Sequence, residues 1–160
     1  MIILKFGGSS IKDASHIKNV YSIVKSKNKN NQLALVFSAI GGITNQLKIL
    51  AENSALKKDI NNDFKKLINT HNNCFTDLLQ KKSSPALDDY YNHLSKDLNE
   101  IKKTKKLTLK KLDKILSYGE ILSTTIISEY LTLKGISSEN LNTTKVILTD
   151  NNFGKAYVHY

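Results

Sequence analysis

Ile2-Ile3-Leu4-Lys5-Phe6-Gly7-Gly8-Ser9-Ser10 joins an apolar run to a glycine pair at the amino end of the chain. The apolar run predicts a buried strand, and the glycines predict a turn in which a ligand can come close to the backbone. Apolar residues recur at helical spacing between Ile11 and Val24, which predicts a helix directly after the turn. Free N–H groups, the start of this helix and the charge of Lys5 favour a bound phosphate, although a glycine pair after a strand is also typical of an ordinary turn.

A second apolar run, Gln32-Leu33-Ala34-Leu35-Val36-Phe37-Ser38, predicts a strand that is covered on both faces. With the first strand and the intervening helix it predicts a βαβ unit, whose two strands are parallel. A second glycine loop, Ala39-Ile40-Gly41-Gly42-Ile43-Thr44-Asn45, follows and leads into a further helix. Because parallel strands end at the same edge of a sheet, we expect the two glycine loops to lie together there.

From about residue 59 to residue 105 the apolar pattern is wholly helical. Two apolar stripes, separated by Ser83-Ser84-Pro85, predict two antiparallel helices packed as a hairpin. His71 and Cys74 lie within the first stripe, so we interpret them as packing residues and not as ligands or nucleophiles.

The pattern after this hairpin predicts a helix over 107–116, an interruption at Ser117-Tyr118-Gly119-Glu120, and then a long apolar helix. Ser117 and Glu120 have the spacing of a capping box, in which each side chain satisfies the backbone of the other residue. Gly135 ends the long helix, and Lys145-Val146-Ile147-Leu148-Thr149 predicts a further strand.

The net charge is +10, but all 24 basic residues are lysines. Base recognition favours the fork of arginine, so we expect no nucleic-acid partner. No apolar run approaches the length of a membrane span, and the first residues do not resemble a signal peptide. Cys74 is alone, which excludes an internal disulfide and agrees with a cytoplasmic location.

Four motifs, in their order and spacing, resemble the aspartokinase family. They are Lys5-Phe-Gly-Gly-Ser-Ser10, Phe37-Ser-Ala-Ile-Gly-Gly-Ile-Thr-Asn45, Ser117-Tyr-Gly-Glu-Ile-Leu-Ser123 and Ile147-Leu-Thr-Asp-Asn-Asn-Phe153. The resemblance covers residues 2–160 and implies the N-terminal part of the kinase domain, from either a monofunctional enzyme or one fused to homoserine dehydrogenase. The implied fold is α/β, a three-layer α/β/α amino-acid-kinase sandwich with a mostly parallel sheet and a helical hairpin insertion. The implied activity is phosphorylation of the side-chain carboxylate of L-aspartate by ATP, with Mg²⁺ held through the nucleotide phosphates, in lysine, threonine and methionine biosynthesis.

The resemblance also implies which residues contact ATP. Lys5 is expected against the transferring phosphoryl group, where its charge contributes to catalysis. The amides of Gly7 and Gly8 are expected to cradle the phosphates, with the hydroxyls of Ser9 and Ser38 bonding nearby. The alternative for Lys5 is a lysine at a strand end that extends into solvent.

Thr44 and Glu120 match the aspartate-binding positions of the family. A carboxylate buried near the zwitterionic substrate suits its α-ammonium, and a hydroxyl at a helix start suits its carboxylate. The alternatives are a helix N-cap at Thr44 and a capping-box partner of Ser117 at Glu120.

Asn142-Thr143-Thr144 stands where aspartokinases usually carry Asp-Ala-Arg, and we assign these three residues no function. The nucleotide-binding half and the regulatory domains are not found after Asp150, so we expect an incomplete and inactive fragment whose exposed sheet edge favours self-association. Two alternatives remain open: another kinase of this fold that acts on glutamate, acetylglutamate or carbamate, and a non-catalytic binding module.

Overall fold

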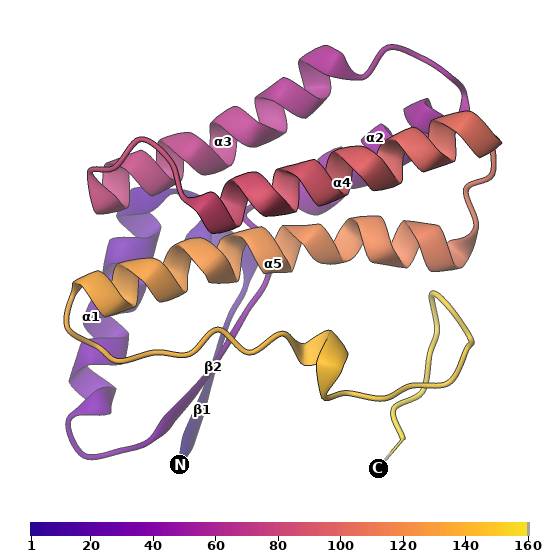
Figure 1. Ribbon diagram of the computed structural model, residues 1–160. Coiled ribbons are helices and arrows are strands. Elements are labelled where there is room, and N and C mark those ends of the chain that lie inside the picture. Colours follow the sequence, from indigo (N-terminus) through magenta and orange to yellow (C-terminus); the bar gives the residue numbers. More distant parts are fainter. Residues whose placement is uncertain (160) are drawn as a thin grey trace.

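Two parallel strands and the helix between them form the amino-terminal unit of the computed structural model, which describes residues 1–159 (Figure 1). Strand β1 (Ile2–Phe6) pairs with β2 (Leu33–Phe37), and helix α1 (Ala14–Asn28) makes the crossover. The rings of Phe6 and Phe37 stack with their centroids 5.3 Å apart. The predicted βαβ unit is therefore confirmed.

The two faces of this sheet differ in their exposure to solvent. Leu4 and Leu35 are neighbours in the register and pack against the core. On the opposite face Ile3 is 66% exposed and Val36 is 47% exposed. The prediction that β2 is covered on both faces is wrong, because no element within residues 1–159 covers this second face.

Four long helices pack beside the sheet (Figure 1). They are α2 (Ile43–Ala55), α3 (Asn61–Leu79), α4 (Pro85–Thr104) and α5 (Leu109–Leu133). The predicted helices between residues 59 and 105 are present as α3 and α4, and they run antiparallel. Their packing differs from a simple hairpin, since α4 lies mainly against α2 and α5, and α3 lies mainly against α5 with smaller contacts to α1 and α2. The Tyr91 hydroxyl of α4 donates a 3.0 Å hydrogen bond to Asn72 of α3.

Helix α5 is continuous through the predicted interruption, and the predicted capping box is absent. Thr108 caps the helix by accepting from the Lys111 amide at 3.3 Å. The Ser117 hydroxyl instead donates to the carbonyl of Lys114 within the same helix, at 2.8 Å. An internal glycine such as Gly119 costs about 1 kcal/mol of helix stability. This cost is outweighed by the burial of nine side chains along α5, at positions 115, 118, 122, 123, 125–127, 130 and 131.

The segment after α5 is irregular, and the predicted strand over 145–149 is wrong. A short 3₁₀ turn, η2 (Thr143–Lys145), is followed by an isolated antiparallel bridge between Thr149 and Val158. Leu148 is exposed, and no strand in the described part of the chain pairs with this run. High β-propensity alone does not form a strand without a partner.

His71 and Cys74 are buried in α3, as expected for packing residues. Burial raises the pKa of the Cys74 thiol to about 12, so the thiol stays protonated and is not a nucleophile. His71 Nδ1 lies 2.8 Å from the Leu67 carbonyl oxygen, which fixes the proton on Nδ1. Its Nε2 atom has no hydrogen-bond partner among residues 1–159.

The backbone of α5 lies unusually close to the loop after β2 at Gly119. A Cβ atom added there would lie 2.7 Å from Cβ of Ala39 and 3.4 Å from Cδ1 of Leu47. We expect Gly119→Ala to destabilise the protein by about 1–3 kcal/mol, as overpacking does in other cores. Urea unfolding measures this change. Ser117→Ala on the same helix is the control and should have little effect; a more stable Gly119→Ala variant would contradict the close contact.

His71 should make stability depend on pH. Burial lowers the pKa of His71, so the unfolded chain binds a proton more readily than the folded one. The free energy of unfolding should therefore decrease as the pH falls below about 6.5, by at most about 1.4 kcal/mol per pH unit. His71→Leu should remove this part of the slope in urea titrations between pH 7 and pH 5. The exposed His93 provides the control, and an equal loss of slope in His93→Gln would contradict the assignment.

Candidate functional site

The two glycine loops meet at the edge of the sheet where β1 and β2 end. The first loop passes through Gly7 into the 3₁₀ turn η1 (Gly8–Ile11), and the second leads into α2. A Cβ atom on Gly8 would lie 2.9 Å from the Ala39 carbonyl oxygen, and one on Gly41 would lie 3.4 Å from the Gly8 carbonyl oxygen. The prediction that the two loops lie together is confirmed, and the contact at Gly8 leaves no room for a side chain.

The first loop presents free backbone donors. The Ser10 amide donates to the Gly7 carbonyl at 2.9 Å. The amides of Gly8 and Ser9 lie in the first turn of η1, and no acceptor for them is found in residues 1–159. Gly7 is exposed, and a Cβ atom there would meet nothing within 4 Å. This open backbone is suited to an anionic ligand.

Lys5 lies on the exposed face of β1, one residue before the end of the strand. Its neighbour in the register is Val36. Lys5 forms no ion pair within the described residues. The Lys5 ammonium is therefore a positive charge close to the first glycine loop. Within the described residues it is not paired with another charged group.

Glu120 joins the site from the middle of α5. One of its carboxylate oxygens, Oε1, accepts a hydrogen bond from the Ala39 amide at 3.2 Å. This bond replaces the capping role predicted for Glu120, because Glu120 is inside a continuous helix. The carboxylate is half-buried and has its second oxygen available for a ligand.

Thr44 lies in the first turn of α2, next to Ile43, which contacts the helix α5 near Gly119. The N-cap of α2 is Gly42, with a φ of 86°, so the N-cap alternative for Thr44 is wrong. The Thr44 side chain is exposed. Ser38 lies at the start of the same loop and is half-buried. Its amide donates a hydrogen bond to the Phe6 carbonyl at 3.1 Å.

Ser123 is a member of this cluster that the sequence reasoning missed. It is fully buried, and its hydroxyl oxygen lies 2.8 Å from the Ser38 carbonyl oxygen. The available signal was its position one turn after Gly119 on the same face of α5. That signal was hidden because the helix was expected to break between these residues.

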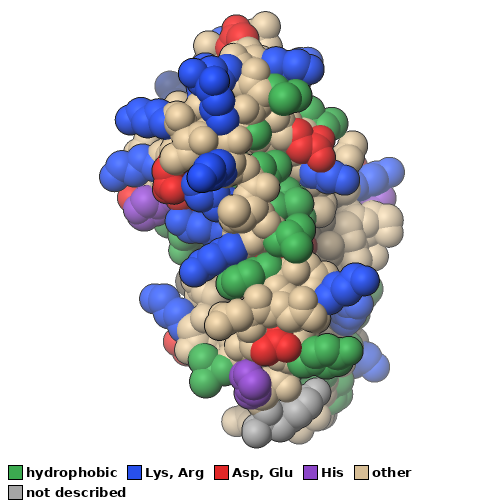
Figure 2. Space-filling model, turned by 90° about the vertical axis from the view of Figure 1, so that its right-hand side faces the viewer, with side chains coloured by type: hydrophobic (Ala, Val, Ile, Leu, Met, Phe, Trp, Pro, Cys, Tyr) green, Lys and Arg blue, Asp and Glu red, His purple; other side chains and the backbone are tan. Residues whose placement is uncertain are grey.

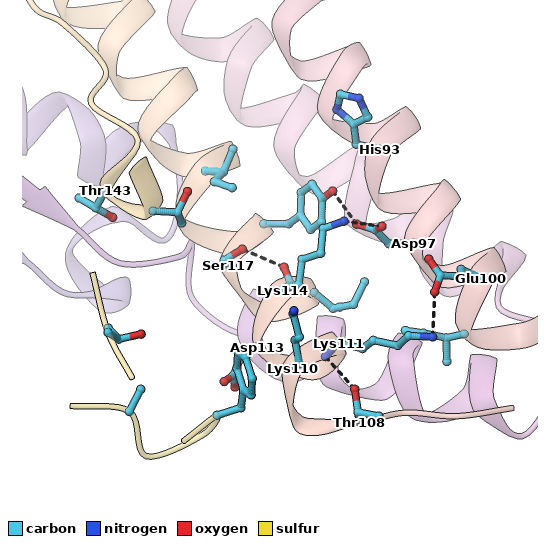
Figure 3. A pocket seen from close by; sticks show the side chains of 18 of the residues that line it. His93, Asp97, Glu100, Thr108, Lys110, Lys111, Asp113, Lys114, Ser117 and Thr143 are labelled. Carbon is cyan, nitrogen blue, oxygen red and sulfur yellow. Dashed lines mark hydrogen bonds and ion pairs between the residues drawn. The ribbon is translucent and has the colours of Figure 1, made fainter. Parts of the chain in front are cut away.

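A cavity lies elsewhere, between α4, α5 and residues 143–156 (Figure 3). Its volume is about 870 Å³, and none of the predicted ligand-binding residues lines it. Asp97 accepts from Lys114 Nζ at 2.7 Å and from the Tyr118 hydroxyl at 2.8 Å. Because these polar groups bond to one another, they attach α4 to α5 and leave few groups for a ligand.

Lysine side chains are spread over the face seen in Figure 2, with apolar and acidic side chains between them. Lys102 and Lys103 occupy the last turn of α4, where cations stabilise the negative end of the helix dipole. The positive charges of these two lysines therefore stabilise the end of α4. The absence of a nucleic-acid partner stays a prediction.

Asp13 and His16 form a helix cap close to the first glycine loop. Asp13 is the N-cap of α1 and accepts from the His16 amide at 3.0 Å and from its ring Nδ1 at 2.8 Å. The hydrogen bonds from His16 and Ser15 hold the pKa of the Asp13 carboxyl well below its usual range.

No group of three candidate metal ligands is present in the part of the chain that the structure describes. No helix of that part is both long and apolar enough to cross a membrane.

Comparison with curated proteins gives long matches to aspartokinases. The bifunctional aspartokinase/homoserine dehydrogenase of Buchnera aphidicola subsp. Acyrthosiphon pisum (strain APS) is 31% identical over 160 residues, covering 94% of this chain and 20% of that protein. The lysine-sensitive aspartokinase 3 of Escherichia coli (strain K12) is 27% identical over 158 residues, covering 98% of this chain and 34% of that protein. The chain thus spans about a fifth to a third of the length of these relatives.

The fold is shared with a solved aspartokinase. The crystal structure of E. coli aspartokinase III in complex with aspartate and ADP matches with a TM-score of 0.83 and 23% identity. The match covers 99% of this chain and 35% of that chain, and it confirms the predicted amino-acid-kinase fold class. In sequence, the amino acid kinase family pattern matches residues 1–158. From this match and the shared fold it follows that the chain belongs to the amino acid kinase family.

Proposed function

We propose that the protein is the N-terminal part of an aspartokinase and that its site binds L-aspartate and the phosphates of ATP. The observation that carries the proposal is the meeting of two glycine loops with Glu120 at one sheet edge. Open amides suit phosphates, and a half-buried carboxylate suits an ammonium group. The relatives support this assignment, because the solved E. coli aspartokinase III holds aspartate and ADP.

In an enzyme that contains this chain, the proposed reaction transfers the terminal phosphoryl group of ATP to aspartate. A side-chain carboxylate oxygen of aspartate bonds to the γ-phosphorus, the bond from that phosphorus to the bridging oxygen breaks, and ADP leaves with the electron pair. Lys5 neutralises charge on the phosphoryl group, while the Gly7 and Gly8 amides and the Ser9 and Ser38 hydroxyls hold the phosphates. Mg²⁺ would be bound through those phosphates.

In the proposed acceptor site, Glu120 binds the α-ammonium of aspartate and Thr44 binds a carboxylate. Because residues 1–160 correspond to a fifth to a third of the aspartokinase relatives, we propose that they bind aspartate without phosphorylating it. Lysine, threonine and methionine biosynthesis is the proposed pathway context. The cytoplasm is the proposed location, supported by the lone, protonated Cys74.

Self-association through the exposed sheet is also a proposal. It is supported by the exposure of Ile3 and Val36 on one face and by a sheet of only two strands within residues 1–159. Unpaired strand edges and exposed apolar side chains both favour contacts between chains.

Binding of L-aspartate to the isolated chain tests the acceptor site. We expect saturable binding in NMR titrations, and Glu120→Gln should weaken it about tenfold because a charge-assisted hydrogen bond is lost. The glutamine keeps an oxygen for the Ala39 amide, so the loop should stay in place. Glu139→Gln, an exposed site with the same charge change, is the control.

Succinate, which is aspartate without its ammonium group, should bind both the original chain and Glu120→Gln with similar weak affinity. Equal affinity of the two proteins for L-aspartate would contradict the role of Glu120. Binding of L-glutamate, acetylglutamate or carbamate in place of aspartate would favour another kinase of this fold.

Turnover tests the role of Lys5 in an enzyme that contains this chain. Lys5→Ala should lower kcat at least about a hundredfold, because removing one electrostatic contact to the transition state costs about 3 kcal/mol. Lys18→Ala, on the exposed surface of α1, should leave kcat unchanged. A nearly normal kcat in an ADP-release assay of Lys5→Ala would remove Lys5 from the mechanism.

A further inference from the structure

Ser123 is a fully buried hydroxyl at the contact between α5 and the loop after β2. Its oxygen lies 2.8 Å from the Ser38 carbonyl oxygen and 3.0 Å from the Glu120 carbonyl oxygen. The second contact is within the helix and is available to any serine at this position. The first joins residues 85 positions apart in the sequence and depends on the tertiary fold.

Ser123 and Glu120 hold the two polar atoms of a single peptide group. The carbonyl of Ser38 and the amide of Ala39 belong to the same peptide bond, which is planar. Ser123 donates to that carbonyl, and Glu120 Oε1 accepts from that amide at 3.2 Å. Rotation of this peptide would break both hydrogen bonds, so the two side chains fix its orientation together.

Close packing reinforces this arrangement. Gly119, one turn before Ser123, brings the α5 backbone so near that an added Cβ would lie 2.7 Å from Cβ of Ala39. The carbonyl of Ala39 in turn lies against Gly8, in the first glycine loop. Ala39, which supplies the amide of the peptide between residues 38 and 39, therefore lies between α5 and the first loop.

We propose that Ser123 is a positioning residue that fixes the peptide between Ser38 and Ala39 and, through it, the carboxylate of Glu120. The hydrogen bond from Ser123 keeps the Ala39 amide directed at Glu120 Oε1. That amide holds one carboxylate oxygen and leaves the other available to the ammonium group of aspartate. The effect on aspartate rests on the proposed function, whereas the effect on the peptide does not.

Ser123→Ala in the 160-residue chain tests the proposal by amide hydrogen exchange. We expect the Ala39 amide to exchange at least about tenfold faster, because its hydrogen bond to Glu120 is weakened. The Phe75 amide, in the core of α3, should be unchanged. Ser117→Ala is the matched control, since its hydroxyl bonds only within α5, and it should alter neither amide.

L-Aspartate titration of the same samples provides the second readout. Ser123→Ala should weaken aspartate binding about fivefold to tenfold, and Ser123→Cys, which keeps a weak donor, should recover part of both effects. If Ser123→Ala does not fold, the comparison of Ser123→Cys with the original chain decides by the same readouts.

Unchanged Ala39 exchange, or equal acceleration of the Ala39 and Phe75 amides, would overturn the proposal. Failure of the original chain to bind aspartate would instead count against the proposed acceptor site. The Ala39 exchange result would still decide whether Ser123 holds the peptide.

Discussion

The contact between α5 and the loop after β2 is the constraint on which the site depends. Gly119 lets the two backbones approach, and Ser123 and Glu120 then bond to one peptide of the loop. Without this approach, the carboxylate of Glu120 would be separated from both glycine loops. Burial of a peptide group costs free energy when its N–H and C=O have no hydrogen-bond partners. The hydrogen bonds that position the loop also supply these partners and so avoid that cost.

Much of the fold could be predicted because local patterns were sufficient. The two apolar runs, each followed by glycines, identified β1 and β2 and the edge at which the loops meet. Parallel pairing followed from the helix between them. The apolar stripes of α3 and α4 also predicted that these segments are helices. They did not predict which elements pack against them, since a stripe indicates that a face is buried but not what covers it.

The errors share one cause, which is that tertiary contacts decided the local structure. Gly119 and its polar neighbours look like a helix break, yet packing keeps α5 continuous. The apolar run before Thr149 looks like a strand, yet within residues 1–159 it pairs with no strand and ends in an isolated bridge at Thr149. The role of Ser123 could not be predicted because its partner is 85 residues away. A serine inside an apolar helix carries no sign of which distant carbonyl it bonds.

The exposed face of the sheet affects what Lys5 can do in this chain. Alternation along β1 turns Leu4 and Phe6 toward the core and therefore directs Lys5 and Ile3 to the opposite, exposed face. In water the attraction between an ammonium and a phosphate is weak, and it strengthens several-fold when solvent is excluded. Lys5 is positioned beside the loop amides, but its surroundings are still aqueous. The described residues thus supply the geometry of the proposed phosphate site, while strong electrostatic stabilisation requires a partner surface that covers this face.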